Sequence, residues 1–267
     1  MKAVELFAGA GGLAMGTAMA GFRHKAVLEW DKYSCDNIRE NQKRGLRIVG
    51  DWPLYEMDVR KFDFLSLPDG IDLVAGGPPC QPFSIGGKAR GEKDERNMFP
   101  EVFRAVRELQ PRAVLIENVK GLARRSFATY FNYLILQLRH PEITRKPDEK
   151  WNEHLSRLER HHTCGMRDGL HYNVVWRLLN AADFGVPQRR ERVIIVGIRS
   201  DLGLEWSFPE PTHSQDALLL EQWCTGTYWD RHQIARKDHP PVPRKSRLRI
   251  ARLGAMGSLW PSKPWQT

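Results

Sequence analysis

Cysteine is scarce in this chain. Its 267 residues include four cysteines, which lie far apart and form no Cys-x-x-Cys pair: Cys35, Cys80, Cys164 and Cys224. Disulfide frameworks and cysteine-type zinc sites need paired or regularly spaced cysteines, so this distribution argues against both. A reducing compartment, the cytoplasm, fits this composition.

Long apolar runs are missing as well. No stretch of about 18 apolar residues occurs, so we expect no transmembrane helix. Residues 1–7 pass directly into an apolar strand and lack the layout of a signal peptide. No internal repeat is evident. With 41% apolar and 27% charged residues, the chain has the composition of an ordinary globular protein.

Positive charge is in excess. The chain carries 41 Lys and Arg against 32 Asp and Glu, a formal net charge of +9. Such a balance favours a polyanionic partner. Basic residues gather in 236–252, which is either a solvated, mobile tail or a segment that follows a nucleic-acid strand or docks a subunit.

Two regions differ in pattern. Residues 1–205 alternate short β-branched runs with helical patterns, which predicts an α/β fold with a doubly wound, mostly parallel sheet. We expect a helix over 99–109. The expected strands are 3–7, 25–28, 71–75, 113–117, 173–178 and 192–197. From about residue 206 the pattern dissolves into an irregular C-terminal extension.

The polar stretch 139–171 contains several histidines and one cysteine. They are His140, His154, His161, His162, Cys164 and His171. Their spacing matches no ligand pattern, and His154 with His161 and His162 reads as one face of an ordinary helix. We therefore predict no metal site.

A glycine-rich turn follows the first predicted strand. Gly9, Gly11 and Gly12 let the backbone turn sharply and approach a ligand ahead of a helix N-terminus. Glu29, at the end of the second strand, can accept hydrogen bonds from two ribose hydroxyls, and Trp30 offers an aromatic face to an adenine ring. By itself this pattern also fits a dinucleotide site. The predicted cofactor-binding residues are Phe7, Gly9, Gly11, Gly12, Leu13, Glu29, Trp30, Asp58, Val59 and Pro78.

The segment 77–84 reads GPPCQPFS and places Cys80 in a turn made rigid by prolines. The strand before it carries this cysteine to the carboxyl edge of the sheet, where open α/β folds place their chemistry. Two later segments also end strands: residues 117–119 read ENV, and residues 188–193 read QRRERV.

These segments, in this order, resemble the cytosine-C5 DNA methyltransferases, and the resemblance covers most of residues 1–205. It implies a methyltransferase-type fold with S-adenosylmethionine as cofactor and duplex DNA as substrate, in a bacterial restriction–modification system. It also implies that the target cytosine is flipped out of the helix. Cys80 would then be the nucleophile that adds to C6 of the base.

The resemblance assigns roles to four further residues. Glu117 would share a proton with N3 of the base, and Asn118 would place Glu117 and the cysteine loop. Arg192 would contact the pyrimidine carbonyl and the carboxylate of Glu117, with Arg190 as a second candidate for this role or for a phosphate.

The chain departs from the family after residue 205. We expect residues 1–205 to form the catalytic and cofactor-binding domain, and residues 206–267 to connect toward a target-recognition domain that is absent or supplied by another chain. A second polypeptide would then supply recognition and a C-terminal helix that walls the cofactor pocket. The alternatives are a truncated, inactive nucleic-acid-binding remnant and an RNA cytosine methyltransferase.

Overall fold

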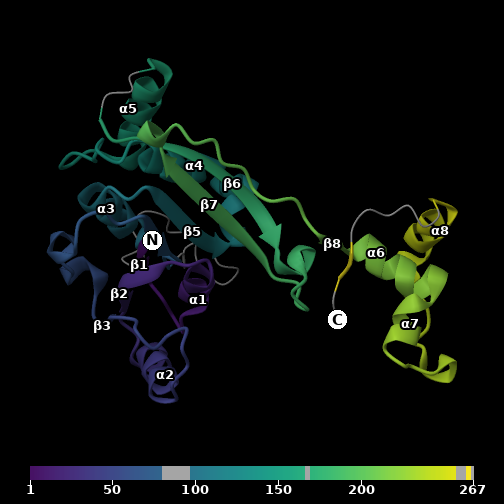
Figure 1. Ribbon diagram of the computed structural model, residues 1–267. Helices are drawn as coiled ribbons and strands as arrows, with labels where there is room; N and C mark the ends of the chain where they lie inside the picture. Colours follow the sequence, from purple (N-terminus) through teal and green to yellow (C-terminus); the bar gives the residue numbers. More distant parts are fainter. Residues whose placement is uncertain (80–96, 166–168, 257–262, 266–267) are drawn as a thin grey trace. The chain divides into compact units, whose positions relative to one another are not determined.

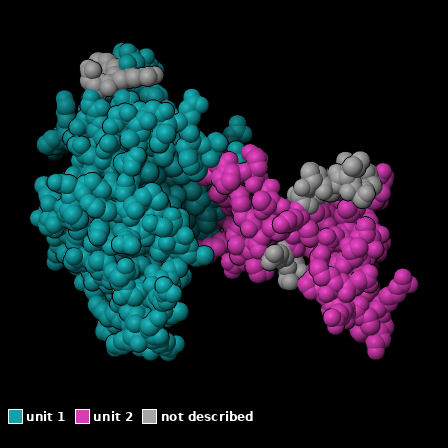
Figure 2. Space-filling view, in the orientation of Figure 1, with its two compact units in different colours: residues 1–178, 192–207 teal, residues 179–191, 208–267 magenta. Residues whose placement is uncertain are grey.

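The computed structural model describes residues 1–79, 97–165, 169–256 and 263–265 (Figure 1). The chain forms two compact units, residues 1–178 with 192–207 and residues 179–191 with 208–267 (Figure 2). Cys80 lies outside the described residues.

Seven strands form one sheet in the order β3-β2-β1-β4-β5-β7-β6. Strands β1 to β5 pair in parallel with one another, and β7 pairs antiparallel with β5. The bounds are β1 Lys2–Leu6, β2 Arg23–Glu29, β3 Leu54–Glu56, β4 Leu73–Gly76, β5 Ala113–Val119, β6 Tyr172–Asn180 and β7 Glu191–Arg199. The predicted doubly wound, mostly parallel sheet is confirmed.

The strand order reverses beside β1. Strands β2 and β3 lie on one side of it, and β4 and β5 on the other. Such a reversal opens a crevice at the carboxyl ends of the strands, where α/β proteins bind ligands. Leu6 at the end of β1 pairs with Gly76 at the end of β4. The turn after β1 and the segment that leads to Cys80 therefore leave the sheet side by side.

Helices cover both faces of this sheet. Val4 and Leu6 of β1 pack in the main core with side chains of α3 and α4, whereas Ala3 packs in a separate cluster with Leu13 of α1. This alternation follows from the two-residue period of a strand. The helices of the larger unit are α1 Gly12–Met19, α2 Lys32–Lys43, α3 Phe99–Leu109, α4 Ala128–Arg139 and α5 Trp151–Thr163.

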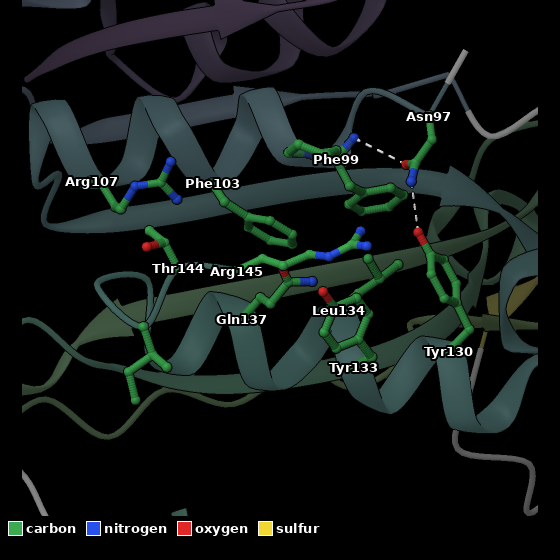
Figure 3. A pocket seen from close by; sticks show the side chains of 12 residues that line it. Asn97, Phe99, Phe103, Arg107, Tyr130, Tyr133, Leu134, Gln137, Thr144 and Arg145 are labelled. Atoms are coloured by element: carbon green, nitrogen blue, oxygen red, sulfur yellow. Dashed lines mark hydrogen bonds between the residues drawn. The ribbon is translucent and has the colours of Figure 1, made fainter. Parts of the chain in front are cut away.

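Helix α3 has the bounds that its sequence predicts. Pro100 stands in its first turn, where no backbone donor is needed, and Gln110 ends it in a left-handed conformation at φ 43°. Phe99 and Phe103 on its inner face are among the buried residues of the main core. These two rings, which line a pocket between α3 and α4 (Figure 3), fix the start of the helix in the main core.

A buried carboxylic acid lies in the middle of β1. The Glu5 side chain is 0% exposed, and neither carboxyl oxygen has a hydrogen-bond partner among the described residues. Burial raises its pKa to about 8. Glu5 is therefore protonated in the folded protein at neutral pH, whereas in the unfolded chain it is ionised.

We expect the free energy of unfolding to fall between pH 4.5 and pH 8 because of this residue. The folded state holds the proton that the unfolded state releases above its ordinary pKa of 4.5, so the stability is fully present below that pH and is lost as the pH rises toward 8. Glu5→Gln should remove this slope and raise stability at pH 8 by roughly 3–5 kcal/mol relative to wild type. Urea unfolding of wild type and Glu5→Gln at pH 4.5 and at pH 8 measures this effect, and Glu205→Gln, at an exposed position, is the control. An equal stability difference between wild type and Glu5→Gln at the two pH values would contradict the prediction.

Short helices occur in the second unit, in the segment where we expected an irregular extension. They are α6 Gln215–Leu220, α7 Thr227–Arg231 and α8 Arg247–Met256, with a two-stranded pair of β8 His213–Ser214 and β9 Lys263–Pro264. Leu219, Ile250 and Leu253 form a small core between α6 and α8. Residues 247–252 of the basic stretch thus lie in helix α8 and not in a structureless tail, and Arg249 of α8 is ion-paired with Asp216.

Candidate functional site

The turn between β1 and α1 has the backbone geometry of a close ligand approach. Phe7 adopts φ 57°, Gly9 φ 54° and Gly11 φ 89°. A positive φ is costly for a residue such as Phe7, and strain of this kind concentrates at functional sites. The turn opens toward the crevice beside β1.

Gly11 is required for a second reason. A Cβ added there would lie 2.8 Å from Cζ3 of Trp52, while a Cβ at Gly12 would meet no atom within 4 Å and Gly12 has no positive φ. We expect Gly11→Ala to lower the free energy of unfolding by about 1–3 kcal/mol through the left-handed backbone alone, and more through the clash. Gly12→Ala is the matched control and should change stability far less in urea unfolding. Equal losses would contradict this account of Gly11.

Glu29 holds the glycine turn in place. Its carboxylate accepts hydrogen bonds from the backbone N–H of Gly9 at 2.7 Å, and from those of Trp30 and Asp31 at 2.8 Å each. The side chain is 8% exposed. A carboxylate offers about four acceptor positions, so Glu29 keeps capacity for a ligand hydroxyl in addition to its three backbone donors.

A cavity of about 330 Å³ lies at the carboxyl edge of the strands. Five of the predicted cofactor residues line it: Phe7, Glu29, Trp30, Asp58 and Val59. Gly9, Gly11, Gly12 and Leu13 lie in the adjoining turn and helix start and are not part of its lining. Pro78 was also predicted to bind the cofactor, but the proline that lines the cavity is its neighbour Pro79. Such a lining, apolar with a few polar groups, is typical of a cofactor site.

Asp58 is engaged by its neighbour. Arg60 donates to its carboxylate through the backbone N–H at 3.0 Å and through Nε at 2.9 Å, and this hydrogen bonding holds the pKa of Asp58 below its usual value. A ligand amino group would have to share this carboxylate with Arg60. Arg60 is not among the predicted cofactor residues, although it stands only two residues after Asp58.

Four further lining residues were also missed. They are Leu28, Met57, Pro79 and Met98. Leu28 and Met57 stand at the ends of the paired strands β2 and β3, and the short β3 was not predicted. Recognising β3 would have placed Met57 at the same sheet edge as Glu29.

An ion pair joins the ends of β5 and β7. Arg192 donates through Nε to Glu117 Oε1 at 2.7 Å, and both side chains are about a quarter exposed, at 26% and 28%. In the antiparallel register Arg192 stands opposite Val119 and diagonal to Glu117, a position from which long side chains meet. Two segments that are 75 positions apart in sequence thus present a carboxylate and a guanidinium together.

Asn118 ties the segment before Cys80 to this pair. Its Nδ2 donates to the carbonyl of Pro78 at 3.0 Å, and its side chain is 3% exposed. A Cβ added at Gly77 would lie 3.4 Å from Oε2 of Glu117. The chain therefore enters the cysteine loop directly beside the Glu117–Arg192 pair.

Arg190 belongs to the other unit. Its backbone N–H donates to Asn180 Oδ1 at 3.0 Å, and its carbonyl accepts from Ala181 N. Of the two arginines proposed from the sequence, Arg192 is the one paired with Glu117.

The histidines of the stretch 139–171 take part in packing. His154 is fully buried and hydrogen-bonded to Tyr133 Oη and to the carbonyl of Ile143, both at 2.8 Å. Burial and the neighbouring His161 lower the pKa of His140 to about 4. Among the described residues no group of three or more His, Cys, Asp or Glu side chains is arranged to hold a metal ion. In the same residues no helix has the length and apolar character to cross a membrane.

The fold and the sequence are similar to those of DNA methyltransferases. The structure superposes with a TM-score of 0.53 and 26% identity on an E. coli prophage protein that carries the provisional description DNA modification methyltransferase, over 82% of this chain and 54% of that one. The family description C-5 cytosine-specific DNA methylase matches residues 1–141 and 153–238. The chain therefore belongs to the C-5 cytosine-specific DNA methylase family.

Two relatives illustrate the match. The chain is 37% identical over 218 residues to the Type II methyltransferase M.NgoMIV of Neisseria gonorrhoeae, which covers 82% of this chain and 58% of the relative. It is 37% identical over 220 residues to the Type II methyltransferase M.AquIA of Picosynechococcus sp., covering 79% of this chain and 77% of the relative. The chain spans about half the length of several curated relatives, for example 49% of M.NaeI of Lentzea aerocolonigenes.

Proposed function

We propose that this chain is the catalytic part of a DNA (cytosine-5-)-methyltransferase of a restriction–modification system. The observation that carries the proposal is the Glu117–Arg192 ion pair at 2.7 Å beside residues 77–78, which lead to Cys80. A base positioned there would meet a carboxylate and a guanidinium from adjoining strand ends, beside the segment that leads to Cys80.

The reaction follows from these groups. The thiolate of Cys80 forms a bond to C6 of cytosine, and the electron pair of the C5–C6 double bond moves to C5 while N3 gains a proton shared with Glu117. C5 would then bond to the methyl carbon while the methyl–sulfur bond of the donor breaks with its electron pair left on sulfur, and N3 would return its proton to Glu117. Loss of the C5 proton to solvent restores the double bond and expels the thiolate. Throughout these steps Arg192 donates hydrogen bonds to the Glu117 carboxyl group and to the pyrimidine oxygen and so fixes their positions.

S-adenosylmethionine is the proposed cofactor, and when bound it supplies an electrophilic sulfonium methyl group. The residues present fit it: Glu29 retains acceptor capacity for ribose hydroxyls, and Trp30 is 71% exposed at the rim of the cavity. Phe7 and Val59 offer apolar contacts from the cavity wall. Asp58, paired with Arg60, lies at the same cavity for the adenine amino group.

Duplex DNA is the proposed substrate, and a bacterial cytoplasm the proposed place of action. The excess of 41 Lys and Arg over 32 Asp and Glu favours a polyanion. The target cytosine must leave the base stack to reach Cys80. The Type II methyltransferases named above, from bacteria such as Neisseria gonorrhoeae, support this context.

A second polypeptide is proposed to supply target recognition and a helix that packs beside the cofactor cavity. Helix α1 supports this idea because its eight residues include no charged side chain, yet Met15 is 37% and Met19 79% exposed. An apolar helix face of this kind is normally covered. The relatives are longer than the part that this chain matches, so a segment that covers α1 could correspond to their remaining length.

The partner proposal is tested by association. Co-purification of the chain with the product of the adjacent reading frame should give a one-to-one complex, which Met19→Glu weakens and Leu65→Glu does not. Leu65 is 73% exposed on a different segment and serves as the matched control. Equal association of both variants would refute the α1 surface as the contact.

The catalytic proposal is tested by trapping. In a duplex that carries 5-fluorocytosine at the target position, the proton that must leave C5 is replaced by fluorine, so the Cys80–C6 bond persists after methyl transfer. We expect a denaturation-resistant protein–DNA adduct that requires S-adenosylmethionine. Adduct formation on RNA instead of DNA would select the RNA methyltransferase alternative, and its absence on both would favour the inactive remnant.

A further inference from the structure

Positive charge is concentrated in one segment of the second unit. Residues 236–252 contain seven Lys and Arg side chains and one acidic side chain, Asp238, so this segment holds six of the nine excess positive charges of the whole chain. The basic residues are Arg236, Lys237, Arg244, Lys245, Arg247, Arg249 and Arg252. None of them belongs to the proposed cofactor or catalytic site.

The strand-like strap before α8, residues 234–246, is held against the core of its unit. The His239 ring stacks on the Trp229 ring with the centroids 4.8 Å apart, and His239 Nε2 lies 3.1 Å from the carbonyl oxygen of Ile234. Val242 packs against the small core that includes Ile250. Three prolines within 240–243 restrict the backbone further. The strap is therefore a structured carrier for the charges that it bears.

The anchoring residues and the basic residues of this segment face different surroundings. His239 and Val242 are partly buried, and Ile250 and Leu253 of α8 are 9% and 5% exposed. The basic residues of the strap and of α8, in contrast, are all exposed. The segment thus presents an open cationic surface to its surroundings.

Six of the seven cations lack an ionic partner. Arg249 is paired with Asp216, whereas in the part of the chain that the structure describes the other six form no salt bridge and no side-chain hydrogen bond. We call these six residues the basic surface. They are Arg236, Lys237, Arg244, Lys245, Arg247 and Arg252.

The stability of α8 does not account for these charges either. Cations stabilise the C-terminal end of a helix and are unfavourable at its N-terminal end. Arg244 and Lys245 directly precede α8, Arg247 begins it, and its first turn contains no acidic residue. Their number and placement therefore point to an anion outside this chain.

The matching anion is extended and carries many charges. The basic surface spreads over the strap and the helix, and none of its six residues lines the cofactor cavity. Duplex DNA carries one negative charge per about 1.7 Å of its axis, which suits such a distribution. A protein partner fits less well, because Leu248 is the one large, exposed apolar side chain within residues 236–252.

We propose that the basic surface binds the phosphate backbone of duplex DNA. Contacts to phosphates position a protein on DNA, whereas contacts to base edges specify the sequence. The basic surface therefore contributes affinity to any DNA sequence, and target recognition comes from other parts of the enzyme. The inference rests on the proposed function, which makes duplex DNA the substrate, and it names the part of the chain that holds the backbone.

The test is the affinity of the full chain for a fluorescently labelled duplex, measured by anisotropy over a range of salt concentrations. Cys80→Ser is present throughout so that no covalent adduct forms, and the product of the adjacent reading frame is added in a second series. We expect a Kd of about 10⁻⁶–10⁻⁴ M near physiological salt. Two duplexes of unrelated sequence show whether the binding depends on sequence.

Two double variants probe the strap and the helix separately. Arg244→Gln with Lys245→Gln, and Arg247→Gln with Arg252→Gln, should each weaken binding by about tenfold or more on both duplexes. Each should also lower the slope of log affinity against log salt by about 2, because two phosphate contacts are lost.

The matched control removes the same charge elsewhere. Lys43 and Arg47 are exposed at the end of α2 and just after it, and Lys43→Gln with Arg47→Gln should leave the affinity within about twofold of the parent chain. No DNA binding in either series, or double variants that lose no more affinity than this control, would overturn the inference. Unchanged DNA binding together with weaker association with the second polypeptide would also overturn it, because the basic surface would then be a subunit contact.

The result is separable from that of the catalytic proposal. A chain that binds DNA through the basic surface but transfers no methyl group, when Cys80 is present, refutes the catalytic proposal alone. A chain that transfers methyl groups, and whose double variants bind DNA as tightly as the control does, refutes the basic surface alone.

Discussion

Cys80→Ser should lower the rate of methyl transfer to cytosine by about 10⁴-fold or more while leaving cofactor affinity unchanged. A serine hydroxyl is a far weaker nucleophile than a thiolate, so the bond to C6 that activates C5 would form too slowly. The variant leaves the residues that line the cofactor cavity, such as Phe7, Glu29 and Trp30, unchanged. The measurement is a single-turnover assay with labelled cofactor, alongside calorimetry with S-adenosylhomocysteine.

Cys164→Ser is the matched control for that experiment. Cys164 is exposed in the structure and is not a lining residue of the cofactor cavity, so the same atom exchange there should leave the rate unchanged. Wild-type transfer by Cys80→Ser would show that the covalent mechanism is wrong. Loss of cofactor binding together with activity would show instead that the substitution disturbs the fold.

Glu117→Gln should reduce the transfer rate by about 10²–10⁴-fold, with little effect on DNA affinity. Glutamine keeps the shape of the side chain and can still meet Arg192, but it cannot share a proton with N3 as charge moves onto the ring. Arg192→Gln should act through the same step, because its Nε holds Glu117 Oε1 at 2.7 Å. Single-turnover rates at saturating DNA and cofactor separate this effect from binding.

The double variant tests whether the two residues act as a unit. If they do, Glu117→Gln combined with Arg192→Gln should be no slower than the worse single variant, because effects of coupled residues do not add. Arg199→Gln is the control on the same strand, since Arg199 is paired with Asp201 at 2.8 Å at the far end of β7. Full additivity, or a wild-type rate in Arg192→Gln, would contradict the assigned roles.

Part of the sheet was predictable because central strands such as β1 and β4 are buried. Runs such as 71–75 and 113–117 are rich in apolar and β-branched residues. In a parallel sheet that is covered on both faces, such a run is a clear indication of a strand. Strand β3, Leu54–Glu56, was not predicted because three residues give no period to detect. With β3 missing, the contribution of Met57 to the cofactor cavity could not be foreseen.

Contacts between segments that are distant in sequence could not be predicted from the sequence pattern. The closeness of Gly11 to Trp52 depends on how α1 and the segment before β3 pack, and neither motif indicates it. The same holds for Asn118 and Pro78, which lie 40 positions apart. Residue types at strand ends predicted which groups gather at the edge of the sheet, whereas the partner of each group emerged only from the packing.

The backbone amides that bind Glu29 are a further example. The sequence indicated an acceptor for ribose hydroxyls, but the structure shows that the carboxylate first accepts from Gly9, Trp30 and Asp31. The acid therefore shapes the glycine turn as well as facing the cavity. A glycine and an acid twenty positions apart do not reveal such a bond, because it depends on the register of β1 against β2.

The most direct test of the catalytic proposal is transfer of labelled methyl from S-adenosylmethionine to mixed-sequence duplex DNA. The assay is run with the chain alone and with the product of the adjacent reading frame added, followed by nucleoside analysis of the DNA. We predict label in 5-methylcytosine when both polypeptides are present, and none when the chain carries Cys80→Ser. No label in either arm, or label on a different atom of the DNA, would contradict the proposal.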